Sequence, residues 1–592
     1  MVRVLGVGRR AGVQGLLVML LLLSYCAPAQ DNVPPKRELR GVWIATVENI
    51  DWPSRRGLTA DQQRREYCRM LDVQQRNGIN AVFVQVRPAA DAFYQSDIEP
   101  WSKWLTGQQG KAPGYDPLPF LIEEAHQRGM EFHAWFNPYR ASTDSVTRRL
   151  APTHPFRQHP EWFLRYGGKL LFNPGLPAVR QYITRVILDV VRRYDIDGVH
   201  FDDYFYPYPE PRQTIHDEAA YAQYNPDNLG LSDWRRQNVN LLIKDLHDDI
   251  RSTKRWVKFG ISPFGVWMNK SSHPDGSDTR AGQPSYANLY ADTRLWLQQG
   301  WIDYVVPQLY WSSNFRLVPY PVLLEWWTRN HFGRHLYIGQ GAYRMLENTR
   351  SDTTWRNPRE LARQVRLNRS YPTDVNGSVF FSSRSLMANP LHTSDTLRQN
   401  LFRYPALIPT MPWMDAVPPR PAQALVLTRV SSAVTLTWLP GPPASDGDQA
   451  RYFVVYRFAQ GETPSPDDPR NILALVPGTT HAPALVDTSA RAGVEYAYYI
   501  TAVDRLHNES APIRATTLHG TEIMVAQVPG VVTPAGPTAP VQEQPAPAQP
   551  TTNPRPIIET KVKTKTEEGE SKTKTKVKYG RHRSFFDKLF GR

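Results

Sequence analysis

The segment DGVHFDDYFYP, residues 197–207, is the stretch of the chain that most constrains its fold. Its apolar part predicts a short buried strand that ends at two adjacent acids, Asp202 and Asp203. A buried carboxylate pair at the end of a strand is unfavourable unless it is paired or used, so the segment indicates acid/base chemistry. The aromatic residues that follow offer flat faces to an apolar or sugar-like ring: Tyr204, Phe205, Tyr206 and Tyr208.

On both sides of this segment, from about residue 40 to residue 402, apolar β-branched runs alternate with amphipathic helical stretches. The predicted strands are residues 41–47, 80–86, 131–136, 198–201, 257–262, 304–309, 336–341 and 378–381. The predicted helices are residues 62–76, 118–128, 178–194, 233–251, 289–299, 321–328, 359–368 and 396–402. Eight strands, each followed by a helix, predict an α/β fold, a closed parallel (β/α)8 TIM barrel. An open doubly wound sheet would have a Gly-rich loop after its first strand, which this sequence lacks.

The barrel prediction places function at the C-terminal ends of the strands and in the loops that follow them. Polar residues gather at these positions in the sequence: Arg87, Asn137, Arg140, Asp202, Asp203, Gln308 and Tyr310. Residues two apart in a strand share a face, which predicts that Gln85 projects with Arg87, His200 with Asp202, and Gln308 with Tyr310. We expect the barrel to occupy residues 36–405.

A second unit is predicted after the linker at residues 415–419. Short alternating strands begin near residue 424, Trp438 closes one of the early strands, and residues 496–499 read YAYY in a late one. Together with the closing stretch AVDRLHNES at residues 502–510, this region resembles a fibronectin type III module, a small all-β sandwich. We expect it at residues 420–518 and assign it no chemistry.

The N-terminal sequence predicts that the protein is exported across the inner membrane. Basic residues precede an apolar run at residues 16–23, and Ala27-Pro28-Ala29 offers a small-residue cleavage site, so residues 1–29 predict a secretory signal peptide. The alternative is a lipidated Cys26. Cleavage after Ala29 leaves Cys68, in a predicted helix, as the remaining cysteine, which excludes an internal disulfide and a thiolate metal site. We expect a periplasmic, cell-surface or secreted protein.

The C-terminal residues 525–592 are rich first in Pro, Ala and Thr and then in Lys and Thr, which predicts a disordered tail. The formal net charge of the chain is +14, and residues 561–592 hold 11 Lys or Arg against 4 Asp or Glu, half of that excess. A basic tail can contact an anionic envelope polymer or a membrane surface, and a solvated tail without a partner is the alternative. We expect no specific nucleic acid partner.

The acid pair predicts a divided role in cleavage of a glycosidic bond, which needs a proton for the leaving oxygen and a negative group near the positive centre. We expect Asp203 to be the general acid. Asp202, inside the barrel mouth, would orient it and raise its pKa by like-charge repulsion. The alternative is a structural network in which the two acids hold Arg87 or Arg140.

The sequence leaves the identity of the second catalytic group open. The seventh strand region, YIGQGAY at residues 337–343, ends without a carboxylate. The remaining candidates are Glu48, Asp51, Asp278 and the acetamide of the substrate itself, a known exception to the plan of two carboxylates. Gln308 and Tyr310 are the candidates to hold such an acetamide.

Several tryptophans near predicted strand ends or in long loops are candidates for stacking on a sugar or for ordinary core packing, among them Trp135 and Trp311. His133 and His200 lie on inward faces, but no HxH or HExxH spacing supports a metal, so we interpret them as hydrogen-bonded barrel histidines. We expect neither a metal nor a cofactor.

Four segments together carry a family resemblance: residues 38–54 (ELRGVWIATVENIDWPS), 80–94 (NAVFVQVRPAADAFY), 133–140 (HAWFNPYR) and 197–207. They resemble the glycosyl hydrolase-like ten family of bacterial envelope proteins. The resemblance implies a (β/α)8 glycosidase, and some relatives resemble peptidoglycan hydrolases that prefer glycan strands stripped of peptide. It also implies these site positions: Arg87, Asn137, Arg140, Asp202, Asp203 and Gln308.

The resulting hypothesis is an exported glycoside hydrolase that acts on a cell-wall or related N-acetylated glycan. Catalysis would rest on Asp203 and Asp202, and the predicted substrate-binding residues are Arg87, Asn137, Arg140, Tyr204, Gln308, Tyr310 and Trp311. Two alternatives are a glycosidase for another polysaccharide and a non-catalytic carbohydrate-binding or wall-anchoring protein.

Overall fold

The computed structural model describes residues 33–347, 351–430, 433–478, 482–516 and 524–525. The predicted signal peptide at residues 1–29 and nearly all of the predicted tail lie outside these described residues. Within them, no helix combines the length and the apolar character that crossing a membrane requires.

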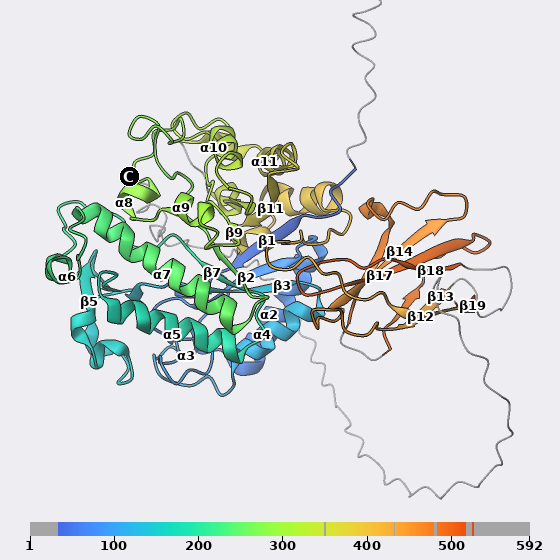
Figure 1. Cartoon of the computed structure of the whole chain (residues 1–592), viewed down its shortest axis with the longest axis horizontal. Helices are drawn as coiled ribbons and strands as arrows, with labels where there is room; N and C mark the ends of the chain where they lie inside the picture. The colour runs from blue at the N-terminus through green and yellow to red at the C-terminus, as the bar shows by residue number, and fades with distance from the viewer. Residues whose placement is uncertain (1–32, 348–350, 431–432, 479–481, 517–523, 526–592) are drawn as a thin grey trace, which may run out of the picture. The chain divides into compact units, whose positions relative to one another are not determined.

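The N-terminal part of the chain forms a closed barrel of eight parallel strands, which confirms the predicted TIM barrel (Figure 1). In order around the barrel, the strands are β1 (Leu39–Ile44), β2 (Ala81–Arg87), β3 (Glu131–Phe136), β7 (Gly198–Phe201), β8 (Lys258–Ile261), β9 (Tyr304–Val305), β10 (His335–Gln340) and β11 (Val375–Phe380). β1 pairs with both β2 and β11, so the sheet has no free edge.

The sixth barrel strand is shorter than predicted. The sequence predicts a strand over residues 304–309, but β9 ends at Val305. Pro307 has no backbone N–H to donate to a neighbouring strand, which explains the early end. The chain then keeps isolated bridges, because Gln308 pairs with Phe264 on one side and with Gly339 on the other.

Helices follow the strands as predicted. The principal ones are α2 (Ala60–Arg76), α4 (Pro117–Gln127), α5 (Pro177–Arg193), α7 (Leu231–Thr253), α10 (Tyr320–Thr328) and α11 (Glu360–Arg369). Shorter ones are α3 (Lys103–Thr106), α6 (Glu218–Gln223), α8 (Ser285–Asn288), α9 (Thr293–Gln298), α12 (Ser383–Met387) and α13 (Thr393–Thr396). The long helices α5 and α7 pack against each other on the outside of the barrel.

Two predicted helices differ from the structure. The helix predicted at residues 289–299 is divided into α8 and α9, because Tyr290 adopts a left-handed φ of 53° and Asp292 caps the start of α9. A helix cannot continue through a residue in that conformation. The helix predicted at residues 396–402 is α13 followed by one π-helical turn, Leu397–Leu401.

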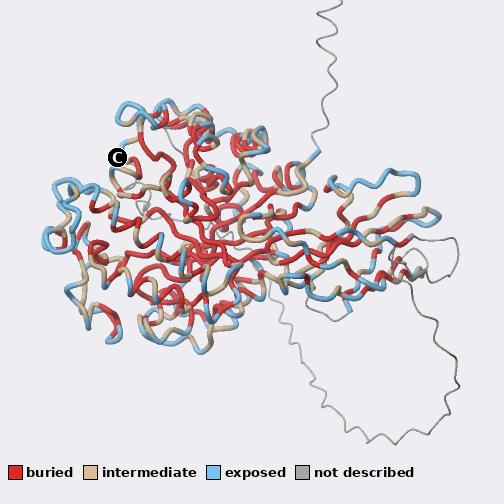
Figure 2. The backbone as a smooth tube through the Cα atoms, in the orientation of Figure 1, coloured by how far each residue is buried: buried red, intermediate tan, exposed pale blue. Residues whose placement is uncertain are grey.

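The barrel interior contains a chain of hydrogen-bonded polar rings. Trp43 donates from its indole nitrogen to His200 over 3.1 Å, and His200 lies 3.2 Å from the hydroxyl oxygen of Tyr304. The same hydroxyl lies 2.8 Å from Nδ1 of His133. Nε2 of His133 lies 2.9 Å from the carboxylate of Glu131. Both histidines therefore have two hydrogen-bonded ring nitrogens, which agrees with the interpretation of them as barrel histidines. Figure 2 shows buried backbone concentrated in the centre of the barrel.

A small antiparallel sheet that the sequence analysis did not predict lies between β3 and α5. It contains β4 (Arg140–Ser142), β5 (Phe163–Tyr166) and β6 (Lys169–Phe172), in the order β4-β6-β5. The two-residue turn between β5 and β6 uses Gly167 and Gly168, both with positive φ, as a tight hairpin requires. This sheet fixes the backbone of Arg140 at the C-terminal end of the barrel.

The C-terminal part of the described chain consists of two antiparallel four-stranded sheets. One holds β12 (Gln423–Val430), β13 (Ala433–Leu439), β16 (Ala484–Asp487) and β19 (Met524–Val525), and the other holds β14 (Tyr452–Ala459), β15 (Ile472–Pro477), β17 (Tyr496–Val503) and β18 (Ile513–Thr516). Trp438 from the first sheet and Phe453 from the second lie in one core, so the two sheets pack face to face as a sandwich.

Candidate active site

The two adjacent acids follow β7 directly, at the C-terminal end of the barrel. β7 ends at Phe201, so Asp202 and Asp203 are no longer bound by strand geometry to point to opposite faces. Each is 5% exposed. Among the described residues, neither acid forms a salt bridge, so the alternative of a structural network held through direct ion pairs lacks support.

Asp202 is held inside the barrel mouth. Its carboxylate accepts a hydrogen bond from the indole of Trp135 at 3.1 Å and from the amide of Asn137 at 3.1 Å. The backbone N–H of Tyr204 donates to its other oxygen at 3.2 Å. Burial raises the pKa of Asp202, while the nearby charge of Arg140 and these hydrogen bonds oppose that rise.

Asp203 has different partners. The hydroxyl of Tyr208 donates to its Oδ2, and the side-chain amide of Gln308 also donates to it. Burial, and next the charge of Asp202, raise the pKa of Asp203 to about 7. The expected like-charge effect is therefore present, but burial is the larger cause.

Arg140 lies near Asp202. Its guanidinium group is 4.4 Å from the ring centroid of Tyr204, and it donates to the carbonyl of Pro88 at 3.3 Å. The carbonyl oxygen of the Asn137 side chain accepts from the backbone N–H of Arg140 at 2.9 Å. Asn137 therefore connects Arg140 to Asp202, and the half-buried ring of Tyr204 covers the guanidinium group.

The carboxyl groups of Asp202 and Asp203 have different electrostatic surroundings. Asp202 receives three hydrogen bonds and a nearby positive charge, which favour its ionised form. Burial, and next the negative charge of Asp202, favour the protonated form of Asp203. A protonated acid beside an ionised one is the pair that acid/base catalysis of glycoside hydrolysis uses.

Arg87 is placed differently from its predicted role as a substrate contact. Its guanidinium group makes two hydrogen bonds to Glu99, at 2.8 and 2.6 Å, and donates to the carbonyl oxygens of Asn137 and Pro138. Arg87 and Glu99 are 1% and 0% exposed. Because its donors are used inside the protein, Arg87 supports the loop that carries Asn137 and is not available to a substrate.

The other predicted binding residues lie after β9. Gln308 is half-buried and donates to the carbonyl of Ser262 at 2.9 Å, which fixes the amide that reaches Asp203. Tyr310 is buried and packs edge-on against Tyr343, at 5.8 Å between ring centroids. Trp311 is buried and packs against Phe264. Of the three, Gln308 contacts Asp203.

The candidates for the second catalytic group fall into two classes. Asp51 is 4% exposed, and its oxygens accept from the backbone N–H of Ala45, the hydroxyl of Ser382 and the backbone N–H of Arg384. These contacts give Asp51 a structural role. Glu48 and Asp278 are both exposed. Glu48 has a left-handed φ of 55°, an unfavourable conformation of the kind that often occurs at functional loops.

Sequence reasoning missed three residues that shape the site. Tyr208 was noted only as an aromatic face, Trp135 only as a ring near a strand end, and Glu99 not at all. The run of aromatics after Asp203 contained the signal for Tyr208, whereas no local pattern marks Glu99, because twelve residues and a loop separate it from Arg87.

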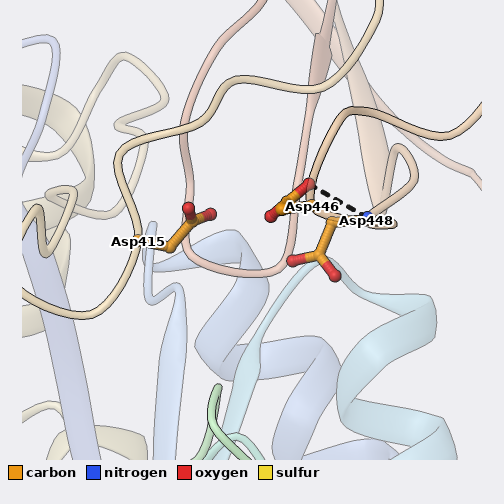
Figure 3. A group of neighbouring side chains, drawn as sticks. All are labelled: Asp415, Asp446 and Asp448. Carbon is orange, nitrogen blue, oxygen red and sulfur yellow. Dashed lines mark hydrogen bonds between the residues drawn. The ribbon is translucent and has the colours of Figure 1, made fainter.

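One group of described acidic residues is close enough to share a cation. Asp415, Asp446 and Asp448 lie together, as Figure 3 shows. Arg255 already binds two of them, at 3.2 Å to Asp446 and 2.9 Å to Asp448, and Asn508 donates to Asp415 at 3.0 Å. These partners account for the cluster as an ion-pair network.

The barrel, with two adjacent buried acids at the end of its fourth strand, has the features of a glycosidase. Comparison with known proteins gives the family. Residues 38–357 match the model of the family described as Glycosyl hydrolase-like 10, and the chain belongs to this family. It is a glycosidase.

Two curated relatives are similar over most of their length. Glycosyl hydrolase YngK of Bacillus subtilis (strain 168) is 45% identical over 507 residues, which cover 85% of this chain and 98% of YngK. Glycosyl hydrolase DigH of Escherichia coli (strain K12) is 38% identical over 406 residues, which cover 62% of this chain and 91% of DigH. Among solved structures, the PgaB (BpsB) glycoside hydrolase domain from Bordetella bronchiseptica is similar at 15% identity, covering 62% of this chain and 99% of the domain with a TM-score of 0.41.

Proposed function

We propose that this enzyme hydrolyses O-glycosidic bonds in an N-acetylated glycan of the bacterial cell wall, with Asp203 as the general acid. One observation carries the proposal: Asp203 is buried at the end of a barrel strand, and its pKa is raised to about 7 beside Asp202. A catalytic acid works best when its pKa lies near the working pH. Membership of a glycosidase family favours this function over a non-catalytic binding protein.

In this mechanism Asp203 donates its proton to the leaving glycosidic oxygen as the bond from that oxygen to the anomeric carbon breaks. The positive charge that develops on the sugar ring is stabilised by the ionised carboxylate of Asp202. The acetamide oxygen of the substrate forms a bond to the anomeric carbon as the glycosidic bond breaks. Water then displaces that oxygen from the anomeric carbon and returns one proton to Asp203. Trp135 and Asn137 keep Asp202 in place through this sequence.

The nucleophile is assigned to the acetamide of the substrate. The direct contacts of Asp203 are Tyr208 and Gln308, neither of which carries a carboxylate, and Asp51 is engaged by the protein. Gln308 is the side chain that we assign to the acetamide group. Glu48, exposed after β1, is the competing candidate for this role.

Substrate binding is assigned to the side chains around the two acids. Tyr204 is half-buried with Arg140 against its ring, so it can present a ring edge to a sugar. Tyr208 packs edge-on against Tyr204 at 5.7 Å between ring centroids. The two rings offer the apolar surface on which sugar faces stack. The predicted contacts of Asn137 and Tyr310 are indirect, through Asp202 and through ring packing.

The experiment that tests this proposal uses peptide-free glycan strands from peptidoglycan and follows the released sugars by mass spectrometry. We expect cleavage by the native enzyme and loss of cleavage with Asp203→Asn and with Asp202→Asn, both folded. Strands chemically stripped of their N-acetyl groups serve as the control, and they should resist cleavage. Cleavage of both kinds of strand at equal rates would contradict the acetamide role, and no cleavage of either would contradict the substrate.

Export of the protein belongs to the same proposal, because a cell-wall substrate lies outside the inner membrane. The predicted signal peptide at residues 1–29 supports it, as does the basic tail, which we assign to contact with an anionic envelope polymer or membrane surface. Fractionation of cells that express the full chain tests this location, and recovery in the cytoplasm would contradict it.

A further inference from the structure

The N-terminal end of the barrel, opposite the acid pair, contains a buried ion pair. Glu131 is the first residue of β3 and Lys258 the first residue of β8. The ammonium group of Lys258 binds the carboxylate of Glu131, and the two side chains are 1% and 5% exposed. Buried charges are stable only when their remaining hydrogen-bonding capacity is also satisfied.

The sandwich supplies one of the hydrogen-bond partners of Glu131. His507 lies in the loop between β17 and β18, and its Nε2 is 2.6 Å from the carboxylate of Glu131. Its Nδ1 is 2.9 Å from the hydroxyl of Tyr452 on β14. Its backbone carbonyl accepts from Arg37 at 2.9 Å. His507 is itself buried, so a residue of the sandwich completes a charged site inside the barrel.

The hydrogen bonds of His507 assign its tautomer. A carboxylate can only accept, so Nε2 of His507 must carry the hydrogen that it donates to Glu131. Nδ1 then accepts from the hydroxyl of Tyr452. Burial, opposed by the charge of Glu131, lowers the pKa of His507, which is consistent with a neutral ring.

The same reasoning extends through the barrel interior. The indole N–H of Trp43 can only donate, so Nε2 of His200 accepts and its Nδ1 donates to the oxygen of Tyr304. The hydroxyl of Tyr304 donates to Nδ1 of His133, whose Nε2 donates to Glu131 at 2.9 Å. All these hydrogen bonds point in one direction, toward the carboxylate that His507 completes.

A rim of charged contacts surrounds this buried centre. Lys36 binds Glu509 at 2.7 Å, Arg505 binds Asp195 at 2.6 Å, and Arg255 binds the two acids of the sandwich loop drawn in Figure 3. Single exposed ion pairs contribute little stability. The rim therefore adds little to the stability of the contact and helps to set its register.

Apolar contacts complete the interface. Leu407, at the end of the barrel segment, shares a buried cluster with side chains of the sandwich: Val454, Tyr456, Phe458, Ile472 and Val503. Leu407 also pairs with the segment just before β1 through a bridge to Arg37. The sandwich thus packs on both the first and the last residues of the barrel.

We infer that the sandwich closes the N-terminal end of the barrel, where His507 binds Glu131. We also infer that the barrel and the sandwich fold and unfold as one unit. This role differs from that of a tethered module that carries a binding surface of its own. It is independent of the substrate and of the catalytic assignments made above.

The first test needs no substitution. Hydrogen exchange of the full native chain is followed by mass spectrometry across a series of guanidinium chloride concentrations. We expect peptides from β3 and from β14 to lose protection at one common concentration, because they belong to one cooperative unit. Loss of protection in β14 at a lower concentration, with β3 still protected, would overturn the inference.

The second test compares His507→Ala with His507→Gln and with the control His216→Ala, whose side chain is 76% exposed. Removing His507 leaves Glu131 short of one hydrogen bond, so we expect exchange of β3 and β8 amides to accelerate at least about tenfold. Glutamine keeps an N–H donor and should restore part of the protection. Unchanged exchange in β3 and β8, with acceleration confined to the sandwich, would contradict the inference. Should His507→Ala fail to fold, the glutamine variant and the series on the native chain decide.

Discussion

The hydroxyl of Tyr208 donates a hydrogen bond to the carboxyl group of Asp203, five residues earlier in the chain. This contact lowers the pKa of Asp203, whereas burial and the charge of Asp202 raise it. Tyr208 therefore works against the effect that keeps Asp203 protonated, and it adjusts the acid to a pKa of about 7. The two residues lie on one loop after β7, and the ring of Tyr208 also packs against Phe264, which follows β8.

The pH dependence of the reaction follows from this contact. A general acid must be protonated, so kcat/KM should hold below the pKa of Asp203, about 7, and fall as the pH rises through it. In Tyr208→Phe the lowering hydrogen bond is lost, so the alkaline limb should move to higher pH. The pH profile of kcat/KM for both proteins measures this shift, and an alkaline limb that moves to lower pH would contradict the assignment.

Arg140 should control the acid limb of the pH profile of kcat/KM. Its positive charge lowers the pKa of Asp202, which must be ionised to stabilise the positive centre on the sugar. Arg140→Gln removes that charge, so the pKa of Asp202 should rise and activity should be lost at a higher pH on the acid side. The same pH profile measures it, with Arg148→Gln, an exposed arginine, as the matched control. An acid limb that stays in place would show that Arg140 acts elsewhere.

The Arg87–Glu99 pair should be structural. Both side chains are buried, and Arg87→Met would leave the carboxylate of Glu99 without its guanidinium partner. We expect a loss of about 3–5 kcal/mol in the free energy of unfolding, measured with urea. The control Arg65→Met, at an exposed position of α2, should change it by less than about 0.5 kcal/mol.

The double variant Arg87→Met with Glu99→Leu separates charge from packing. It removes both buried charges, so much of the stability lost in Arg87→Met should return. A loss in Arg87→Met no larger than that in Arg65→Met would instead show that the pair does not hold the loop.

Substitution of Glu48 distinguishes the two candidates for the nucleophile, the substrate acetamide and Glu48 itself. If the substrate acetamide attacks the anomeric carbon, Glu48→Gln should keep kcat within about threefold of the native value, since the group adds less than 1 kcal/mol to catalysis. If Glu48 is the nucleophile, kcat on the N-acetylated glycan should fall by at least about a hundredfold. Steady-state kinetics on peptide-free glycan strands distinguish the two results.

The sequence predicted the barrel because its evidence is local and repeated. Each predicted strand is an apolar run, the stretches between them are amphipathic, and eight such repeats without a Gly-rich loop after the first strand predict a closed barrel. The position of Asp202 and Asp203 followed from the rule that sites lie at the C-terminal ends of barrel strands. The early end of β9 was missed although Pro307 was a visible signal for it.

The parts that could not be predicted depend on contacts between distant residues. Arg87 looked like a binding residue because it follows a strand, but Glu99 occupies its guanidinium group. His507 reaches Glu131 across 376 positions of the chain, and nothing near either residue marks that contact. The two acids differ in their surroundings: the charge of Arg140 acts on Asp202, whereas Tyr208 and Gln308 donate to Asp203. Only the folded loops bring these side chains together.

The most direct test of the account is the rate of Asp203→Asn on two substrates that differ only in the leaving group. A dinitrophenyl leaving group departs without a proton, whereas the sugar of a glycan strand needs one. We predict that the variant loses about a hundredfold or more in kcat/KM on the glycan strand and stays within about tenfold of the native enzyme on the dinitrophenyl glycoside. Equal losses on both substrates, or native rates on the glycan, would contradict Asp203 as the general acid.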